Sequence, residues 1–393
     1  MPARPGLLSG ALAVGLVFAG CSGAPEGSVG TDASTAAAST EQPAPVASAE
    51  PAAPAEVRTA TTPADAPPPS DAVSTTTTTA GSTPPPGEVA IAFVGDVMLA
   101  RTIGDRVLAG EDPFAGVSAQ LGDADLVVGT LETTVGEGGV PQDKAFTFQA
   151  PPEAVDSLLG SGFDLVALAN NHSYDYGTGG LTGTIRLLDE AGLDHVGAGA
   201  DAATARAPVV LSAGGIDTAF LSYVDVPDDW TGYRNRDWAA TDTRPGVAWA
   251  VPEEIAADVT AAREEADHVV VLLHAGVEGS QQPSALQHSL ADIALEAGAT
   301  AVIGGHPHVL QGSRHEHGQL TAWSLGNFVF DGFGNDPVAS RSVILTVTLD
   351  EEGLTEVTWT PVRIVDGFPV ALDPDSPEGR AHLDRLEALP TQR

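Results

Sequence analysis

Cysteine, lysine and long apolar runs are all scarce in this sequence. Cys21 is the only cysteine among 393 residues, which excludes an internal disulfide. Lys144 is the only lysine, and 53 acidic residues outnumber 17 basic ones, giving a formal net charge of −36. A field of this sign disfavours contact with nucleic acid and with anionic lipid surfaces. The apolar run from Leu7 to Phe18 is too short to span a bilayer as a helix.

The N-terminus has the features of an export signal. Arg4 supplies a positive charge, an apolar run follows, and Ala19-Gly20-Cys21 is a small-residue cleavage site. The position of Cys21 resembles a bacterial lipobox, in which the cysteine is acylated and becomes the new N-terminus. We therefore predict that residues 1–21 are a lipoprotein signal peptide and that Cys21 anchors the exported protein at the outer face of the cell membrane. The alternative is an ordinary secretory signal that is cleaved nearby.

Composition divides the rest of the chain into two parts. Residues 22–87 are rich in alanine, proline, threonine and serine and have too few apolar side chains to offset the entropy of ordering, so we predict a disordered tether. Residues 88–393 have the size of one α/β domain. Seven acidic and two basic residues precede Glu88, so the domain carries about −31 of the total charge.

Apolar, β-branched runs alternate with helical patterns in the first part of the domain, which is typical of parallel α/β sheets. The predicted strands are Val89–Val94, Leu126–Val128, Leu165–Leu168, Ala219–Tyr223, Val269–Leu273 and Ala301–Ile303. The predicted helices are Pro152–Leu159, Leu181–Ala191, Glu253–Ala266 and Ser284–Ala297. Three strands without helices between them follow, at Ala322–Phe330, Val343–Leu349 and Thr355–Ile364. A parallel half followed by an antiparallel half predicts two stacked sheets with helices outside.

Side chains that can bind metal follow these strands repeatedly. They are Asp96, Glu132, Asn171 with His172, His274, and His306 with His308. In open α/β sheets, ligands bind beyond the carboxyl ends of the strands, so we expect these side chains to meet. A mixture of oxygen and nitrogen donors suits Mn, Fe or Zn better than Ca or Mg. The sequence therefore predicts a site for one or two divalent transition metals.

The pair His306 and His308 is the most informative part of this pattern. Side chains two residues apart in an extended segment point the same way, so both imidazoles are expected to face one point. Each candidate alone has a structural alternative: Asp96 can cap a turn, and a histidine at a strand end can be a core residue. Met98 is expected in the core.

Six segments together resemble the CapA family of bacterial capsule-synthesis proteins, also called the poly-γ-glutamate biosynthesis type. They are Phe93 to Arg101, Thr130-Leu131-Glu132, Asn170 to Gly177, His274 to Glu278, Gly305 to Gln311 and Ser324 to Asp331. The resemblance implies a four-layer αββα sandwich of the calcineurin-like metallophosphatase type. It also implies metal ligands at Asp96, Glu132, Asn171, His274, His306 and His308. By the same resemblance His172 protonates the leaving group, and Arg101 and Asn327 lie at the pocket edge. The predicted catalytic residues are therefore His172, Asp96 and Arg101.

The chain departs from related metallophosphoesterases at Asp96-Val97-Met98, where Asp-x-His is usual, so one ligand of the first metal is absent. Within the family pattern, Thr130 replaces an asparagine, Ala275 a tryptophan and Gly279 a tyrosine. The missing histidine of the Asp-x-His pattern bears on whether one metal or two can bind. The other departures alter the shape of the pocket.

Two functions of different class follow from this site. We expect a surface-anchored, metal-dependent hydrolase of capsule or poly-γ-glutamate biosynthesis that cleaves a phosphoester or amide bond with metal-activated water. The alternative is a non-catalytic accessory protein that binds an anionic polymer for its assembly, export or attachment. The expected partners are an anionic cell-surface polymer or its precursor, the membrane through the lipid anchor, and other capsule-assembly proteins, but no nucleic acid. A structural surface module, with histidines that are merely buried, would bind no metal.

Overall fold

The computed structural model describes residues 87–229, 231–333 and 336–391. The predicted signal peptide, Cys21 and the predicted tether as far as residue 86 lie outside these ranges. Within them, none of the helices combines the length and the apolar character that a membrane span requires.

The larger sheet has eight strands and combines both parallel and antiparallel pairing. Its order is β18-β17-β16-β1-β2-β5-β6, with β15 also paired to β1. The strand β1 is parallel to β2 and β15 and antiparallel to β16. The bounds are β1 Glu88–Val97, β2 Leu126–Leu131, β5 Leu165–Ala167, β6 Asp194–Val196, β15 Asn327–Val329, β16 Arg341–Asp350, β17 Gly353–Val365 and β18 Phe368–Ala371.

The second sheet has six strands in the order β13-β14-β12-β11-β9-β8. The strands β9, β11, β12 and β14 are parallel, and β8 and β13 are antiparallel edge strands. The bounds are β8 Val209–Ala213, β9 Ile216–Asp225, β11 His268–Ala275, β12 Ala301–Gly305, β13 Ser313–Glu316 and β14 Gln319–Ala322. Two small sheets pair β3 (Thr134–Val135) with β4 (Gln149–Ala150) and β7 (Ala198–Gly199) with β10 (Gly246–Val247).

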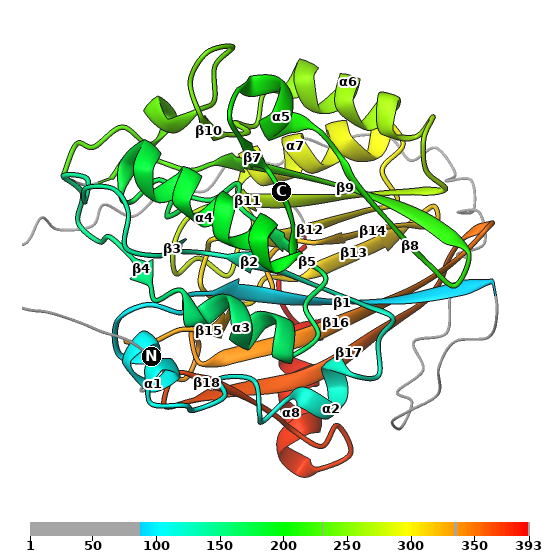
Figure 1. Ribbon diagram of the computed structural model, residues 1–393. Helices are drawn as coiled ribbons and strands as arrows, with labels where there is room; N and C mark the ends of the chain where they lie inside the picture. Colours follow the sequence, from blue (N-terminus) through cyan, green and yellow to red (C-terminus); the bar gives the residue numbers. More distant parts are fainter. Residues whose placement is uncertain (1–86, 230, 334–335, 392–393) are drawn as a thin grey trace, which may run out of the picture. The chain divides into compact units, whose positions relative to one another are not determined.

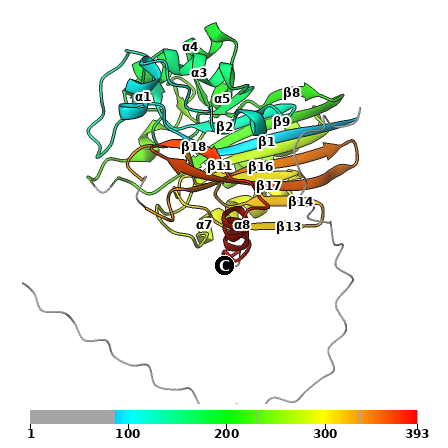
Figure 2. The same cartoon turned by 90° about the horizontal axis from the view of Figure 1, so that it is seen from below.

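The two large sheets pack face to face, and helices cover their outer faces. The helices are α1 Arg101–Leu108, α2 Ser118–Leu121, α3 Glu153–Gly160, α4 Gly177–Ala191, α5 Ala202–Arg206, α6 Pro252–Ala262, α7 Ala285–Glu296 and α8 Pro377–Glu387, with a 3-10 turn η1 at Asn235–Trp238. Figures 1 and 2 show α1, α3 and α4 on one side of the strands and α7 on the other. One apolar cluster lies between the sheets, and two others lie between a sheet and its helices. The predicted four-layer αββα fold is confirmed.

Two details of the prediction are wrong. The antiparallel strands do not form a sheet of their own, because β16 pairs with β1 and thereby extends the parallel sheet. The predicted strand Ala322–Phe330 is two strands, since β14 ends at Ala322 in the second sheet and β15 begins at Asn327 in the first. The chain therefore crosses between sheets within four residues. Apolar residues on both sides of that crossing made the run look continuous.

Replacing Phe93 with alanine should destabilise the domain by about 3–5 kcal/mol, because it leaves a cavity between the sheets. Phe93 in β1 is 1% exposed and packs against Phe220 in β9, with ring centroids 6.5 Å apart. Chemical denaturation followed by tryptophan fluorescence measures the change in unfolding free energy. Phe146→Ala is the control, since Phe146 is 59% exposed and should change that energy little.

Candidate metal centre

The six predicted ligands come together at one edge of the stacked sheets. Asp96 lies near the end of β1, Glu132 follows β2, Asn171 follows β5, His274 lies near the end of β11, and His306 and His308 follow β12. All six side chains are buried. Three of these strands belong to the first sheet and two to the second, so the centre closes the interface between the sheets.

The turn that carries His306 and His308 is not extended, contrary to the prediction. The strand β12 ends at Gly305, and the backbone φ is 95° at His306 and 56° at His308. Non-glycine residues adopt this region rarely and at a cost, so the surroundings must hold the turn. The backbone N–H of His306 donates to Asp96 Oδ2 over 3.1 Å. Both imidazoles still face the site, but through a strained turn rather than through strand periodicity.

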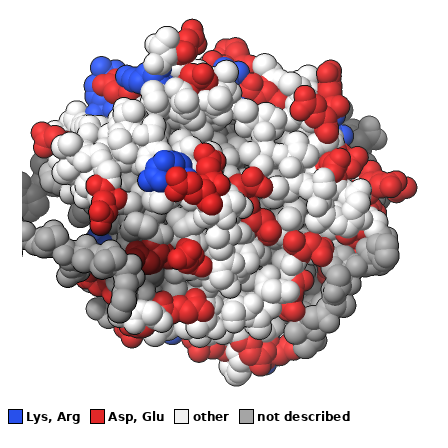
Figure 3. Space-filling view, viewed as in Figure 1, with Lys and Arg blue, Asp and Glu red and all other residues white. Residues whose placement is uncertain are grey.

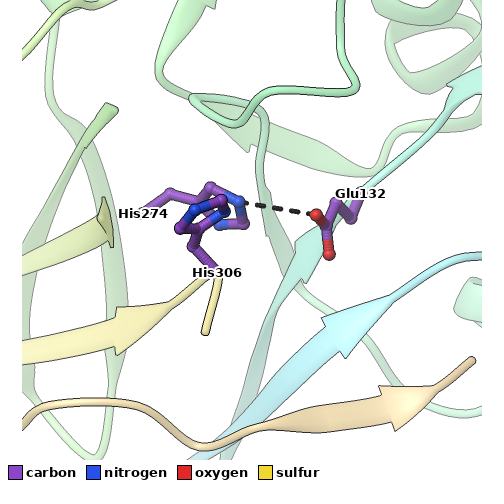
Figure 4. A group of neighbouring side chains, drawn as sticks. All are labelled: Glu132, His274 and His306. Atoms are coloured by element: carbon purple, nitrogen blue, oxygen red, sulfur yellow. Dashed lines mark ion pairs between the residues drawn. The ribbon is translucent and has the colours of Figure 1, made fainter. Parts of the chain in front are cut away.

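Two groups of donor atoms lie close enough together to hold an ion. One comprises Glu132, His274 and His306, and the other comprises Asp96, Glu132 and His308. Glu132 Oε1 lies 3.5 Å from His274 Nε2 and 3.8 Å from His308 Nε2. Figure 4 shows the Glu132 carboxylate directed at His274 and His306. Because Glu132 belongs to both groups, it is the residue that can join two ions.

Hydrogen bonds orient two of the histidines from outside the centre. The side chain of Asn171 accepts from His274 Nε2 over 2.8 Å, and the side chain of Asn327 accepts from His308 Nδ1 over 2.9 Å. Fixing one ring nitrogen in this way decides which other nitrogen faces a metal. The amide of Asn171 thus supports His274, and its role as a ligand stays a prediction.

The buried polar atoms of the centre fit a cation. Asp96 Oδ1, both carboxylate oxygens of Glu132, His274 Nδ1 and His306 Nδ1 have no hydrogen-bond partner among the described residues. Leaving so many buried acceptors unpaired is costly unless something else binds them. Burial, and then the charge of Glu132, raise the pKa of Asp96 to about 8, while burial lowers the pKa of His308 to about 3. The imidazoles are therefore neutral at pH 7, which is the form that binds metal.

A second set of contacts fixes His172 beside the centre. Its Nδ1 donates to Asp175 Oδ2 over 2.6 Å, and its Nε2 lies 3.9 Å from Glu132 Oε1. The same Asp175 oxygen accepts the Phe148 backbone N–H, and Asp175 Oδ1 pairs with Lys144 Nζ at 2.7 Å. The only lysine of the chain is thus buried behind the pair His172–Asp175. Burial lowers the pKa of His172 to about 4, although Asp175 opposes the shift.

The two residues predicted at the pocket edge differ in position. Arg101 lies near His172: its side chain is 46% exposed, pairs with Asp331 at 3.4 Å, and lies over the ring of Phe148, which stacks on His172. Asn327 is not at the edge, because it is fully buried beside His308. Arg101 forms its ion pair with Asp331 and not with a predicted metal ligand, so its assignment as a catalytic residue stays a prediction.

Sequence reasoning missed three residues of the site. In the sequence, Asp175 was only one residue of a family motif with no role assigned, and Lys144 was only the single lysine of the chain. Glu278 is exposed at the rim of the centre, its charge acts on both Glu132 and His274, and partial desolvation raises its pKa. Glu278 follows His274 by four residues, beyond the end of β11, and the strand pattern gave no reason to expect a site residue there. Met98 is in the core, fully buried, as predicted.

Comparison with known proteins agrees with the site. Residues 90–332 match the family model described as "Bacterial capsule synthesis protein PGA_cap". The chain belongs to this family. The family's range contains every residue of the centre. The predicted CapA resemblance is therefore confirmed.

Several relatives carry the same family name. The chain is 31% identical over 295 residues to "PGA biosynthesis protein CapA" of Bacillus subtilis, covering 73% of this chain and 75% of that one. It is 32% identical over 293 residues to "Capsule biosynthesis protein CapA" of Bacillus anthracis, covering 72% and 69%. Among solved structures, a hypothetical protein from Thermus thermophilus aligns with a TM-score of 0.44 at 18% identity, over 69% of this chain and 98% of that one.

Metal binding should release protons and tighten as the pH rises through about 8. The raised pKa of Asp96 means that its carboxyl holds a proton at pH 7 in the metal-free protein, and a metal must displace it. The histidines contribute little, because their lowered pKa values leave them already neutral. Titration calorimetry at pH 7 in buffers of different ionisation enthalpy should give different heats. Burial also raises the pKa of Glu132 well above its ordinary value, so its proton adds to the release. Equal heats would show that no proton is exchanged.

Proposed function

We propose that this family member is a metal-dependent hydrolase that acts on a phosphoester or amide bond of an anionic cell-surface polymer or its precursor. The observation that carries the proposal is the shared carboxylate of Glu132, with unpaired oxygens, between neutral histidines and beside a His172–Asp175 pair. The names of the relatives from Bacillus support capsule or poly-glutamate biosynthesis as the setting.

The residues of the two donor groups would hold one or two divalent transition metals, for which the mixed oxygen and nitrogen donors are suited. A cation at this site supplies Lewis acidity, which activates water and stabilises developing negative charge. Mn, Fe and Zn all fit this donor set.

His172 moves the proton in the proposed reaction. Its Nδ1 is held by Asp175, so Nε2 is the ring atom open to the centre. Because burial keeps the imidazole neutral at pH 7, Nε2 first accepts the proton that the attacking water loses. It then delivers that proton to the leaving oxygen or nitrogen. Arg101, at the rim, supplies a positive charge for the anionic part of the substrate.

The export and anchoring of the protein are part of the same proposal. Acylation at Cys21 would hold the domain at the outer face of the cell membrane, where a surface polymer is accessible. Metabolic labelling with a palmitate analogue tests this in cells: label on the full chain and none on Cys21→Ala is expected. Label that persists in the variant would contradict the anchor.

A second candidate function is the non-catalytic accessory protein, and Met98 favours it. The buried Met98 stands where related enzymes place a histidine ligand, so the first metal lacks a donor. One relative, 28% identical over 290 residues, is named "Probable polyglutamine synthesis accessory protein" in Mycobacterium tuberculosis. This reading predicts metal binding and polymer binding without turnover.

Metal content and hydrolysis together decide between these functions. Elemental analysis of the purified full chain should find one or two transition-metal equivalents, and the double variant His306→Ala/His308→Ala should lose them. The metal-loaded chain is then tested on p-nitrophenyl phosphoesters and on γ-glutamyl anilide. Turnover that disappears in the double variant supports the hydrolase. Metal without turnover on either substrate class supports the accessory protein, and no metal after reconstitution contradicts both.

A further inference from the structure

Arginine side chains gather on one face of the first sheet, beside the metal centre. Arg341 begins β16, and its direct cross-strand partner in β17 is Arg363. Like charges placed opposite each other in an antiparallel pair are destabilising, so the pairing calls for a compensating anion. Helix α8, which packs on β17, carries Arg385. We call Arg341, Arg363 and Arg385 the arginine cluster.

The buried side chain of His382 lies within the field of this cluster and hydrogen-bonds the Ser342 backbone. His382 in α8 is 4% exposed, and its Nε2 has no hydrogen-bond partner among the described residues. Burial lowers its pKa to about 4, and the charges of all three arginines act on the ring in the same direction. The three arginine charges make the electrostatic potential at this neutral imidazole positive. An anion bound by the guanidinium groups would offset this potential, while Nε2 of the neutral ring is an acceptor and would not itself bond that anion.

Among the described residues, one ion pair involves the cluster, although Asp366, Asp384 and Glu387 are also nearby in the fold. Glu378 pairs with Arg363 at 2.9 Å, and Asp336 acts on Arg341 from a distance. Arg341 and Arg385 form no ion pair with any residue in the described ranges. This is unusual in a domain with about −31 net charge, whose acidic side chains spread over the face shown in Figure 3. The arginine cluster is therefore a positively charged patch on a surface that otherwise repels polyanions.

The sheet register places the arginine cluster at the same end of the first sheet as the metal centre. In the antiparallel pair of β1 and β16, Phe93 lies opposite Leu345, so the end of β1 with Asp96 and the start of β16 with Arg341 point to the same end of the sheet. At that end β15 is the strand that pairs with Asp96, so β16 begins beyond it. Adjacent strands are about 5 Å apart, so Arg341 lies roughly 10 Å and Arg363 roughly 15 Å across the sheet from that strand end. A chain with acidic groups at regular intervals can therefore contact both places.

We propose that the arginine cluster binds a carboxylate of the acidic polymer, a few units away from the part held at the metal centre. The inference rests on the proposed function for the identity of the polymer. Arginine forks match carboxylates in geometry, and Glu378 already places one carboxylate on Arg363. Glu378 is thus an internal competitor for the polymer. A polyanion repelled by the remaining surface is guided along one path from the cluster to the centre.

Binding of a fluorescein-labelled poly-γ-glutamate oligomer to the full chain, measured by anisotropy at low ionic strength, tests the cluster. Arg341→Gln and Arg385→Gln should each weaken binding about tenfold, the loss expected for one charged contact. Arg186→Gln removes the same charge from the exposed pair with Glu190 and should change affinity less than twofold. Equal losses in all three variants would mean a general charge effect and would overturn the inference.

A further variant is expected to strengthen binding, a gain that misfolding cannot produce, and a second variant on the same helix is its control. Glu378→Gln should strengthen binding several-fold, because it frees Arg363. Glu387→Gln, the same charge change on the same helix, should have a smaller effect. Weaker or unchanged binding in Glu378→Gln would count against the cluster. Inorganic phosphate that displaces the oligomer at low concentration, when free glutamate does not, would reassign the site to phosphate and overturn the polymer as its ligand.

The measurement is made with a chelator present and scores no turnover. A wild-type chain that does not bind the oligomer therefore overturns the cluster and leaves the hydrolase proposal standing. If the chain hydrolyses nothing but its binding of the oligomer still depends on the cluster arginines, the hydrolase proposal fails and the cluster proposal stands.

Discussion

Glu132→Gln should lower metal affinity by more than about 100-fold, the largest effect that we expect at this site. Changes outside the ligand shell of metal sites already cost about 10–100-fold, and Glu132 belongs to both donor groups. Glutamine keeps the shape of the side chain but removes the negative charge and one of the two acceptor oxygens. If two ions bind, both should be lost together, because Glu132 would be a ligand of each.

Elemental analysis and calorimetry measure this loss, and circular dichroism shows whether the fold is kept. Glu137→Gln is the matched control, since Glu137 lies five residues further along the chain, just after β3, and is exposed. A Glu132→Gln variant that retains one full equivalent would show that one ion is held by other residues alone. The donor group would then need to be redefined around Asp96 and the histidines.

His172→Gln should lower kcat by about 10²–10⁴-fold without loss of metal, the contribution usual for a positioned proton-transfer group. Nε2 of His172 is 3.9 Å from Glu132, close to the reacting position but outside both donor groups. Metal content should therefore stay at the wild-type value. Steady-state kinetics on whichever substrate class is turned over supplies the measurement.

Two supporting variants separate proton transfer from simple damage. Asp175→Asn removes the charge that holds the His172 Nδ1 proton and should lower kcat in the same direction. Lys144→Gln removes the counter-charge of Asp175 and should act through the same ring. His315→Gln, in the exposed β13–β14 hairpin, is the control and should leave kcat unchanged. Normal kcat in His172→Gln would remove this histidine from the mechanism.

Lys144 illustrates a limit of sequence reasoning at this site. In the sequence it is only the single lysine of an acidic chain. In the structure it is buried, donates to the Asn171 carbonyl over 2.6 Å, and pairs with Asp175, 31 residues away in the chain. A charge of this kind is stable in the interior only because the chain supplies both partners. Nothing local to Lys144 in the sequence indicates them.

The turn at His306 shows a prediction that was right for the wrong reason. Both imidazoles face the site as predicted, but positive φ angles at His306 and His308 direct them, not the alternation of an extended strand. Gly305 is required there, since a Cβ on it would come within 2.5 Å of Asp96 Oδ1. The backbone of this turn is held by a residue 210 positions earlier, through the hydrogen bond from His306 to Asp96.

The sequence by itself determined the class of fold and the chemistry of the centre. Buried strands appear as continuous apolar runs, and the polar residues that follow them are recognisable because parallel strands bring their ends to one edge. Only the tertiary structure decided which strands are neighbours, that β16 joins β1, and that Glu132 is shared. It also placed Arg341 opposite Arg363. These facts depend on contacts between residues far apart in the chain, and the periodicity of a sequence carries information only about residues that are close in it.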